Sequence, residues 1–293
     1  MADRRDPFEA LARPVAPFAP RPAFAAALRR RLLEELDMTS TDDTPTATPT
    51  GEDGQLVMVH LRVADADRAG VFFGVLFGWE TERVPFDDHV SHYTVNTDVT
   101  VRLRDDPGAP PVIPNYGVGD VAATIRAVEA AGGTISASDP EPDGGGWAQG
   151  TDDQGLPLLV YRPGRYHEHA PPSRRPTGQV GLVFVREDLP RARAFYGSLF
   201  GWALQPEYPG SHYANAVPRV GVFDEAAVSG EPVPVSATLF LEVDALEPAL
   251  ARVDELGGVA GEVDHTMGPY VSAVCTDDQG TVFGLLSSRL EAE

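Results

Sequence analysis

The sequence contains no lysine, because all 23 of its basic residues are arginine. Without a lysine amine no side chain can form a Schiff base, and the chain lacks the phosphate-binding lysine of a P-loop. The single cysteine, Cys275, excludes internal disulfides, CxxC redox pairs and thiolate zinc sites. No apolar run approaches the roughly 18 residues of a membrane span, and the N-terminus lacks the apolar core of a signal peptide. We therefore expect a cytoplasmic protein with no membrane partner.

Basic residues are also few relative to acidic ones. The chain has 44 acidic residues and a formal net charge of −21. A nucleic-acid partner is not expected, because binding phosphates requires a basic face that displaces counterions. The 293 residues, of which 42% are hydrophobic, suffice for about two globular domains.

The first 54 residues differ from the rest of the sequence. Apolar residues recur every four positions at Phe24, Leu28 and Leu32, which predicts an amphipathic helix within an N-terminal extension, residues 1–38. We expect this helix to pack on the protein's own body or to contact a protein partner. Residues 39–54 are rich in Thr, Asp and Pro and predict a disordered linker.

Four short motifs occur twice in the same order, 120 to 125 positions apart. They are Leu-Phe-Gly-Trp at 76–79 and 199–202, Ser-His-Tyr at 91–93 and 211–213, Gly-Gly at 132–133 and 257–258, and Thr-Asp-Asp-Gln-Gly at 151–155 and 276–280. This repeat indicates a duplicated domain of about 110 residues. We place domain one at 55–165, a second linker at 166–177 and domain two at 178–290.

Each copy predicts the same order of elements. In the first, a strand at 58–63 precedes a helix at 67–77 that stops at Gly78, and three short strands follow. The order then starts again with a strand near 112–118 and a helix at 121–131 that ends at the Gly-Gly pair. The fold class is therefore α+β, with two βαβββ units in each domain.

These motifs resemble those of the vicinal oxygen chelate superfamily, which includes glyoxalase I, extradiol dioxygenases and the bleomycin- and fosfomycin-resistance proteins. The resemblance rests on Phe-Tyr-Gly-Ser-Leu-Phe-Gly-Trp at 195–202, Val-Asp-Ala at 243–245 and the two Asp-Asp-Gln-Gly turns. The resemblance covers about residues 56–165 and 178–288. The chain is similar to tandem, actinobacterial-type glyoxalase-like proteins. It implies that the two units of a domain form one cupped mixed sheet, with helices on the convex side and a ligand in the cup. We call these cup one and cup two.

Enzymes of this superfamily bind a divalent Fe, Mn, Zn or Ni ion through His, Gln and Glu side chains. The resemblance places the three ligand positions on His60, Ile113 and Leu159 in domain one, and on Leu182, Thr238 and Gly284 in domain two. Of the roughly three metal ligands that the superfamily uses, only His60 is present. We therefore expect no cofactor, and His60 is a metal ligand only in the less favoured alternative.

Two residues are candidates for acid–base catalysis, His60 and Glu242. Glu242 shares strand parity with Thr238, and a buried carboxylate in cup two would have a raised pKa. The paired aspartates of the two Asp-Asp-Gln-Gly turns are interpreted as turn formers that bind their own backbone.

Strand alternation predicts which side chains line the cups. With His60 inward, Arg62, Asn115 and Tyr161 also face cup one, and Phe240 and Glu242 face cup two. Trp147 is expected either to stack on a planar ligand or to cover the sheet edge. The repeated pairs add titratable candidates, of which at most one per pair reaches a cup: His92 and Tyr93, and His212 and Tyr213.

The favoured hypothesis is a protein that binds a small organic ligand, anionic or rich in oxygen, mainly in cup one and without a metal. The first alternative is an enzyme of the superfamily, a lyase, isomerase or dioxygenase-like protein with atypical metal ligands. The second is an interaction scaffold with vestigial cups. We also expect the two domains to pack as a pseudo-twofold pair that buries an open sheet edge.

Overall fold

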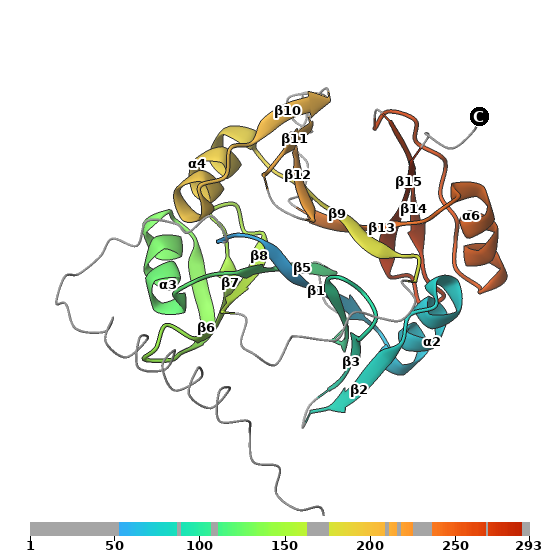
Figure 1. Cartoon of the computed structure of the whole chain (residues 1–293), viewed down its shortest axis with the longest axis horizontal. Coiled ribbons are helices and arrows are strands. Elements are labelled where there is room, and N and C mark those ends of the chain that lie inside the picture. The colour runs from blue at the N-terminus through green and yellow to red at the C-terminus, as the bar shows by residue number, and fades with distance from the viewer. Residues whose placement is uncertain are drawn as a thin grey trace, which may run out of the picture. The chain divides into compact units, whose positions relative to one another are not determined.

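Two mixed β-sheets dominate the computed structural model, which describes residues 53–86, 89–106, 111–162, 176–208, 211–215, 218–224, 236–267 and 269–288 (Figure 1). The first sheet has eight strands in the order β2-β3-β4-β1-β5-β8-β7-β6. Its strands are β1 (Leu56–Val63), β2 (Thr81–Pro85), β3 (Val90–Thr94), β4 (Thr100–Asp105), β5 (Val112–Gly117), β6 (Thr134–Pro140), β7 (Gly146–Thr151) and β8 (Pro157–Tyr161). Helices α2 (Ala66–Phe77) and α3 (Val121–Ala130) complete two βαβββ units, which meet where β1 pairs antiparallel with β5.

The second sheet repeats this plan with seven strands, in the order β10-β11-β12-β9-β13-β15-β14. Its elements are β9 (Gln179–Arg186), α4 (Leu189–Phe200), β10 (Gln205–Tyr208), β11 (Ser211–Tyr213), β12 (Arg219–Phe223), β13 (Ser236–Glu242), α6 (Leu246–Glu255), β14 (Tyr270–Thr276) and β15 (Val282–Ser288). The expected eighth strand is replaced by two isolated bridges, Val259 to Thr276 and Asp264 to Ser272. Glycines at 257, 258 and 261 weaken strand propensity there, and a Cβ on Gly261 would lie 1.9 Å from the Val274 carbonyl oxygen.

The repeated Leu-Phe-Gly-Trp motif marks the end of the first helix in each domain. Asp65 and Asp188 cap the helix starts, each accepting a hydrogen bond at 2.9 Å from the backbone N–H three residues on. Gly78 and Gly201 end the helices with φ of 78° and 68°, a left-handed conformation that favours glycine. The sequence motif therefore encodes a helix stop, as predicted.

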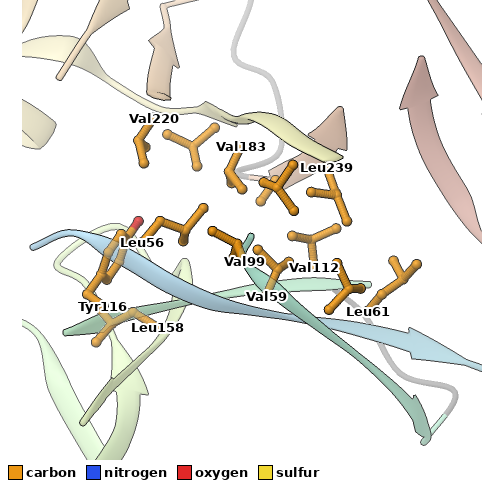
Figure 2. Close-up of a cluster of buried hydrophobic side chains, with 14 of the residues drawn as sticks. Leu56, Val59, Leu61, Val99, Val112, Tyr116, Leu158, Val183, Val220 and Leu239 are labelled. Atoms are coloured by element: carbon orange, nitrogen blue, oxygen red, sulfur yellow. The ribbon is translucent and has the colours of Figure 1, made fainter. Parts of the chain in front are cut away.

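The two sheets pack face to face through one shared core. Figure 2 shows Val183, Val220 and Leu239 of the second sheet pointing toward Leu56, Val59 and Val112 of the first. Val59 and Val183 are fully buried and belong to one continuous apolar cluster. The helices contribute to the same core, since Phe73 of α2 and Tyr196 of α4 belong to this cluster. We call the buried side the core face of each sheet; the opposite face carries the cup.

Both Asp-Asp-Gln-Gly turns contact the other domain. In the first, Asp152 Oδ1 accepts hydrogen bonds from its own turn, from the backbone N–H of Gln154 and of Leu156, as predicted for a turn former. Asp153 Oδ2, however, accepts from Arg191 Nε at 2.9 Å, and Gln154 Nε2 donates to the Asp188 carbonyl at 3.1 Å. The turn is thus bound to the N-terminus of α4.

The second turn makes the equivalent contacts with α2. Arg68 Nη2 donates to Asp278 Oδ2 at 2.5 Å, and Gln279 Nε2 donates to the Asp65 carbonyl at 3.1 Å. The two domains therefore pack with pseudo-twofold symmetry, as expected. They meet through the core faces and these two turns, not through the sheet edges that we expected to be buried.

No helix within the described ranges is long and apolar enough to cross a membrane. The N-terminal extension, most of the linker at 39–54 and most of the linker at 166–177 lie outside the described residues, so the predictions made for them stay predictions.

Candidate functional site

The Ser-His-Tyr repeat establishes which positions of the two cups are equivalent. Tyr93 pairs across the sheet with Arg102, and His60 pairs with Arg102 from the other side. In domain two, Tyr213 pairs with Gly221, which pairs with Phe184. The counterpart of His60 is therefore Phe184. The alignment of His60 with Leu182 is wrong, because the loops that join the first strand to the helix differ in length.

The register confirms the cup-facing set predicted for domain one. His60, Arg62 and Asn115 lie on the face opposite the buried core residues Val59 and Leu61. His60 is 4% exposed and Asn115 is fully buried, so this cup is lined by polar groups that are largely shielded from water.

Arg102 is a half-buried cation of cup one. Its Nε donates to Ser91 Oγ at 3.0 Å, and its Nη2 lies 2.9 Å from His89 Nε2. The rings of Phe86 and Tyr93 lie 5.1 and 5.2 Å from the guanidinium carbon, within the range of cation–π contacts. Burial lowers the pKa of Arg102, but a guanidinium stays protonated in proteins. No carboxylate within the described ranges pairs with this charge.

Two further arginines share a single carboxylate. Arg62 Nη2 donates to Asp106 Oδ2 at 2.7 Å, and Arg104 Nε lies 3.6 Å from the same oxygen. Arg104 Nε is buried and has no hydrogen-bond partner. Three cations therefore face one paired acid, which makes this end of cup one electropositive although the chain is strongly acidic.

His60 lies at the centre of these arginines. Burial, reinforced by the charges of Arg102, Arg104 and Arg62, lowers the pKa of His60 to about 3. The imidazole is therefore neutral at physiological pH and can accept or donate a hydrogen bond without adding charge.

The opposite end of cup one is aromatic. Trp147 of β7 and Tyr161 of β8 are cross-strand partners, and Trp147 is 39% exposed. Burial raises the pKa of Tyr161 to about 12, so its hydroxyl stays protonated. Asn115 lies between the two ends, paired with Met58 of β1 and Leu159 of β8.

Cup two is filled by its own side chains. Leu182, Tyr213, Phe240 and Leu286 form an apolar cluster on the cup face, with Phe184 packed against it. Glycines make room for the two phenylalanines. A Cβ on Gly221 would lie 2.6 Å from the Phe184 ring, and one on Gly284 would lie 2.2 Å from the Phe240 ring.

The two histidines of the repeated pairs do not face the cups, and Glu242 is exposed. His92 faces α2, where Nε2 bonds Asp67 at 2.7 Å and Nδ1 bonds Thr81 at 2.9 Å, and His212 pairs with the core-face residue Val222. Tyrosine is therefore the cup-facing member of each pair. Glu242 is exposed at the end of β13, so it is not the buried carboxylate that was expected in cup two.

Sequence reasoning missed Arg102 and Arg104, the cations closest to His60. A signal was present, because these arginines alternate with Val101 and Leu103, the pattern of a strand with one apolar face. Placing that strand beside β1 required the sheet order, which alternation alone does not supply.

Comparisons with known proteins agree with this architecture. Residues 178–285 match the family described as Glyoxalase/Bleomycin resistance protein/Dioxygenase superfamily. A solved homoprotocatechuate 2,3-dioxygenase from Arthrobacter globiformis is similar with a TM-score of 0.58 and 14% identity, over 85% of this chain and 84% of that one. The Mn(II)-bound glyoxalase from Novosphingobium aromaticivorans gives 0.52 and 18%, over 84% of each chain. Residues 178–285, which make up most of domain two, therefore match this superfamily.

The family match of domain two and the likeness to these solved structures establish a tandem vicinal oxygen chelate-like fold and leave the activity open. A xylose isomerase-like TIM barrel/4-hydroxyphenylpyruvate dioxygenase fusion protein is also similar, with a TM-score of 0.52 and 13% identity. The match covers 90% of this chain but only 54% of that protein. A search of curated protein sequences finds no match. Identities this low extend the fold to this chain, but not a substrate.

The two cups do not offer a metal-binding donor set within the described residues. In cup one, Ile113 and Leu159 occupy two of the three expected ligand positions, and three arginines surround His60. In cup two the expected glutamate position is Gly284, covered by the Phe240 ring. Across the described ranges, no three His, Cys, Asp or Glu side chains are grouped so that they could hold a metal ion. A divalent cation does not fit these residues.

Proposed function

We propose that this protein binds a small organic anion in cup one without a metal ion. The observation that carries the proposal is Arg102, a half-buried guanidinium that faces the cup with no carboxylate partner within the described ranges. A charge withdrawn from water is costly unless it is paired, so an anionic ligand would supply the missing partner. A guanidinium donates two parallel hydrogen bonds to a carboxylate or phosphate, which suits both ligand classes.

The other residues of the cup support the same ligand chemistry. Arg62 and Arg104 extend the positive field and share only Asp106. Such local focusing offsets the repulsion that a net charge of −21 would exert on an anion. Trp147, Tyr161 and Tyr93 provide aromatic surface for an organic ligand.

Enzymatic turnover is the weaker alternative. A histidine whose pKa is lowered to about 3 is a weak base, and Glu242 is exposed. His60 therefore does not offer the base near neutral pH that proton abstraction requires. Turnover of a bound anion would revive the enzyme hypothesis.

The proposal is tested with benzoate, a small aromatic carboxylate, in isothermal titration calorimetry of the full chain. Arg102→Gln removes the charge and should weaken binding by about tenfold or more, because charge-assisted hydrogen bonds are lost. The matched control is Arg219→Gln in cup two, since Arg219 also lies over a tyrosine ring, 5.2 Å from Tyr213, and pairs with Glu207. Benzoate binding should not change in that control.

Two results would overturn the proposal. One is loss of benzoate binding in Arg219→Gln with full binding in Arg102→Gln, which would place the ligand in cup two. The other is stoichiometric Fe, Mn, Ni or Zn in protein purified without a chelator, measured by elemental analysis.

A further inference from the structure

Asn115 is a buried amide without a partner inside the candidate site. Its side chain is fully buried, and neither Nδ2 nor Oδ1 has a hydrogen-bond partner. An amide left in this condition costs stability, since a buried polar group normally has at least one partner. The other buried asparagine, Asn96, shows the usual condition, because its amide binds the Glu80 N–H and the Gly78 carbonyl.

The side chain of Asn115 is directed to the cup and not to the core. Its chain neighbour Tyr116 points to the core face, toward the second sheet (Figure 2). Asn115 pairs with Met58 on one side and Leu159 on the other. Met58 is a flexible side chain that can move to admit a ligand, which a branched residue would do less easily.

A carboxamide presents one donor and one acceptor side by side. Its natural complement is a planar edge with an adjacent acceptor and donor, as asparagine uses when it binds two atoms of an adenine edge. A lactam or an imide offers such an edge through its cis amide. Two antiparallel hydrogen bonds would then satisfy both unpartnered atoms at once.

The distance from Asn115 to the arginines indicates where this ligand would carry its acid group. Asn115 pairs with Met58, two residues from His60, which places it about 7 Å along the strand from the row of Arg102 and His60. A ring with an amide edge at Asn115 and an acid on the opposite side spans this distance together with an arginine side chain. Trp147 and Tyr161 lie beyond Asn115, where they offer aromatic surface to a flat ring.

We propose that cup one is specific for lactam or imide acids, and that Asn115 selects the amide edge while Arg102 binds the acid. This inference rests on the proposed function and names the ligand class of the same site. It also makes Asn115 a specificity-determining residue whose lack of a partner in the free protein costs stability.

The test compares orotate, a planar imide acid, and pyroglutamate, a lactam acid, with benzoate and uracil, which each carry only one of the two features. Calorimetry on the full chain should give a dissociation constant for orotate or pyroglutamate about tenfold or more below that of benzoate, with uracil weaker still. Asn115→Leu should abolish this preference, so that orotate and pyroglutamate bind no more tightly than benzoate. Its melting temperature should equal or exceed that of the native chain, because the variant removes two unpartnered buried polar atoms.

Asn96→Leu is the control, because Asn96 is a partnered asparagine outside the cup. It should lower the melting temperature and keep the preference for the amide acids. The inference is overturned if neither amide acid exceeds benzoate, or if Asn115→Leu weakens all acids equally. If benzoate still depends on Arg102 in that case, the proposed function stands. If no acid binds at all, both fall.

Discussion

The two domains have the same fold but fill equivalent cup positions with opposite chemistry. Where domain one has His60, Arg102 and Asn115, domain two has Phe184, Gly221 and Phe240. In cup two a phenylalanine covers a glycine twice, so large and small residues compensate and the cup closes on itself. Cup one keeps half-buried cations and a buried, unpartnered amide, which cost stability. The two copies therefore differ in that one cup is closed by its own side chains and the other is lined by polar and charged groups.

The core faces differ in the reverse sense. Glu187 of domain two occupies the position of Val63, and Tyr196 occupies that of Phe73, so the polar groups lie between the sheets on the side of domain two. The Glu187 carboxyl is buried beside Asp152, and the Tyr196 hydroxyl donates to Asp152 Oδ2 at 3.0 Å. Each domain thus carries a buried polar cluster, but only that of domain one faces a cup.

The largest expected effect is on stability, at Phe240. Phe240→Ala empties the centre of cup two and should lower the free energy of unfolding by about 3–5 kcal/mol. Trp147→Ala in cup one is the matched aromatic truncation, and it should cost less than about 1 kcal/mol because Trp147 is 39% exposed. Chemical denaturation of both variants measures the difference. Equal losses would show that cup one is as much a packed core as cup two.

A second effect concerns Glu187 and depends on pH. Burial, with a contribution from Asp152, raises the pKa of Glu187 from 4.5 to about 11. Below pH 4.5 the carboxyl is protonated in both the folded and the unfolded chain. Between pH 4.5 and about 11 only the folded chain keeps the proton, so the native protein loses stability as pH rises.

Glu187→Gln removes this dependence. The variant should gain on the order of 2 kcal/mol of unfolding free energy at about pH 8 and little at about pH 4.5. Glu187→Val, which installs the residue of domain one, should show the same trend, and denaturation at both pH values measures it. The opposite result would be a native chain whose unfolding free energy increasingly exceeds that of the variants as pH rises. It would mean that folding stabilises the ionised carboxylate, so that the pKa of Glu187 is lowered and not raised.

The fold could be predicted from the sequence because the same motifs occur in both halves of the chain. Matching motifs such as Leu-Phe-Gly-Trp mark helix ends through Gly78 and Gly201, and alternation assigned the cup face from one histidine. These signals are local, so one chain suffices to detect them. The prediction of an eighth strand in domain two was wrong. The close approach of Gly261 to the Val274 backbone can be seen only when the neighbouring strand is placed.

The candidate site was predicted in part. Parity on β1 and β5 gave His60, Arg62 and Asn115, but Arg102 lies on a strand whose neighbour is set by long-range pairing. The same limit explains the misalignment of His60 with Leu182, because only strand pairing shows which residues correspond across loops of unequal length. The role of the Asp-Asp-Gln-Gly turns was half predicted. Their first aspartate shapes the turn, while the second aspartate and the glutamine bind the other domain.

A third prediction decides between the cups by ligand binding. Arg62→Ala should weaken benzoate binding several-fold, less than Arg102→Gln, because Arg62 is already paired with Asp106. Phe240→Ala should leave the affinity of the folded protein unchanged. Calorimetry below the melting temperature of each variant measures both. Loss of binding in Phe240→Ala with none in Arg62→Ala would assign the ligand to cup two.

The smallest effect is expected at the two equivalent ion pairs between the domains. Arg68 with Asp278 and Arg191 with Asp153 join each turn to the opposite helix, yet both arginine side chains are more than half exposed. Exposed pairs contribute little, because water solvates the charges and salt screens them. Arg68→Gln and Arg191→Gln should therefore lower the melting temperature slightly and equally, and added salt should remove the difference from the native chain. A larger loss at Arg191 that persists in high salt would indicate coupling to buried Glu187, since Arg191 lies near that carboxyl and Arg68 has Val63 in the equivalent place.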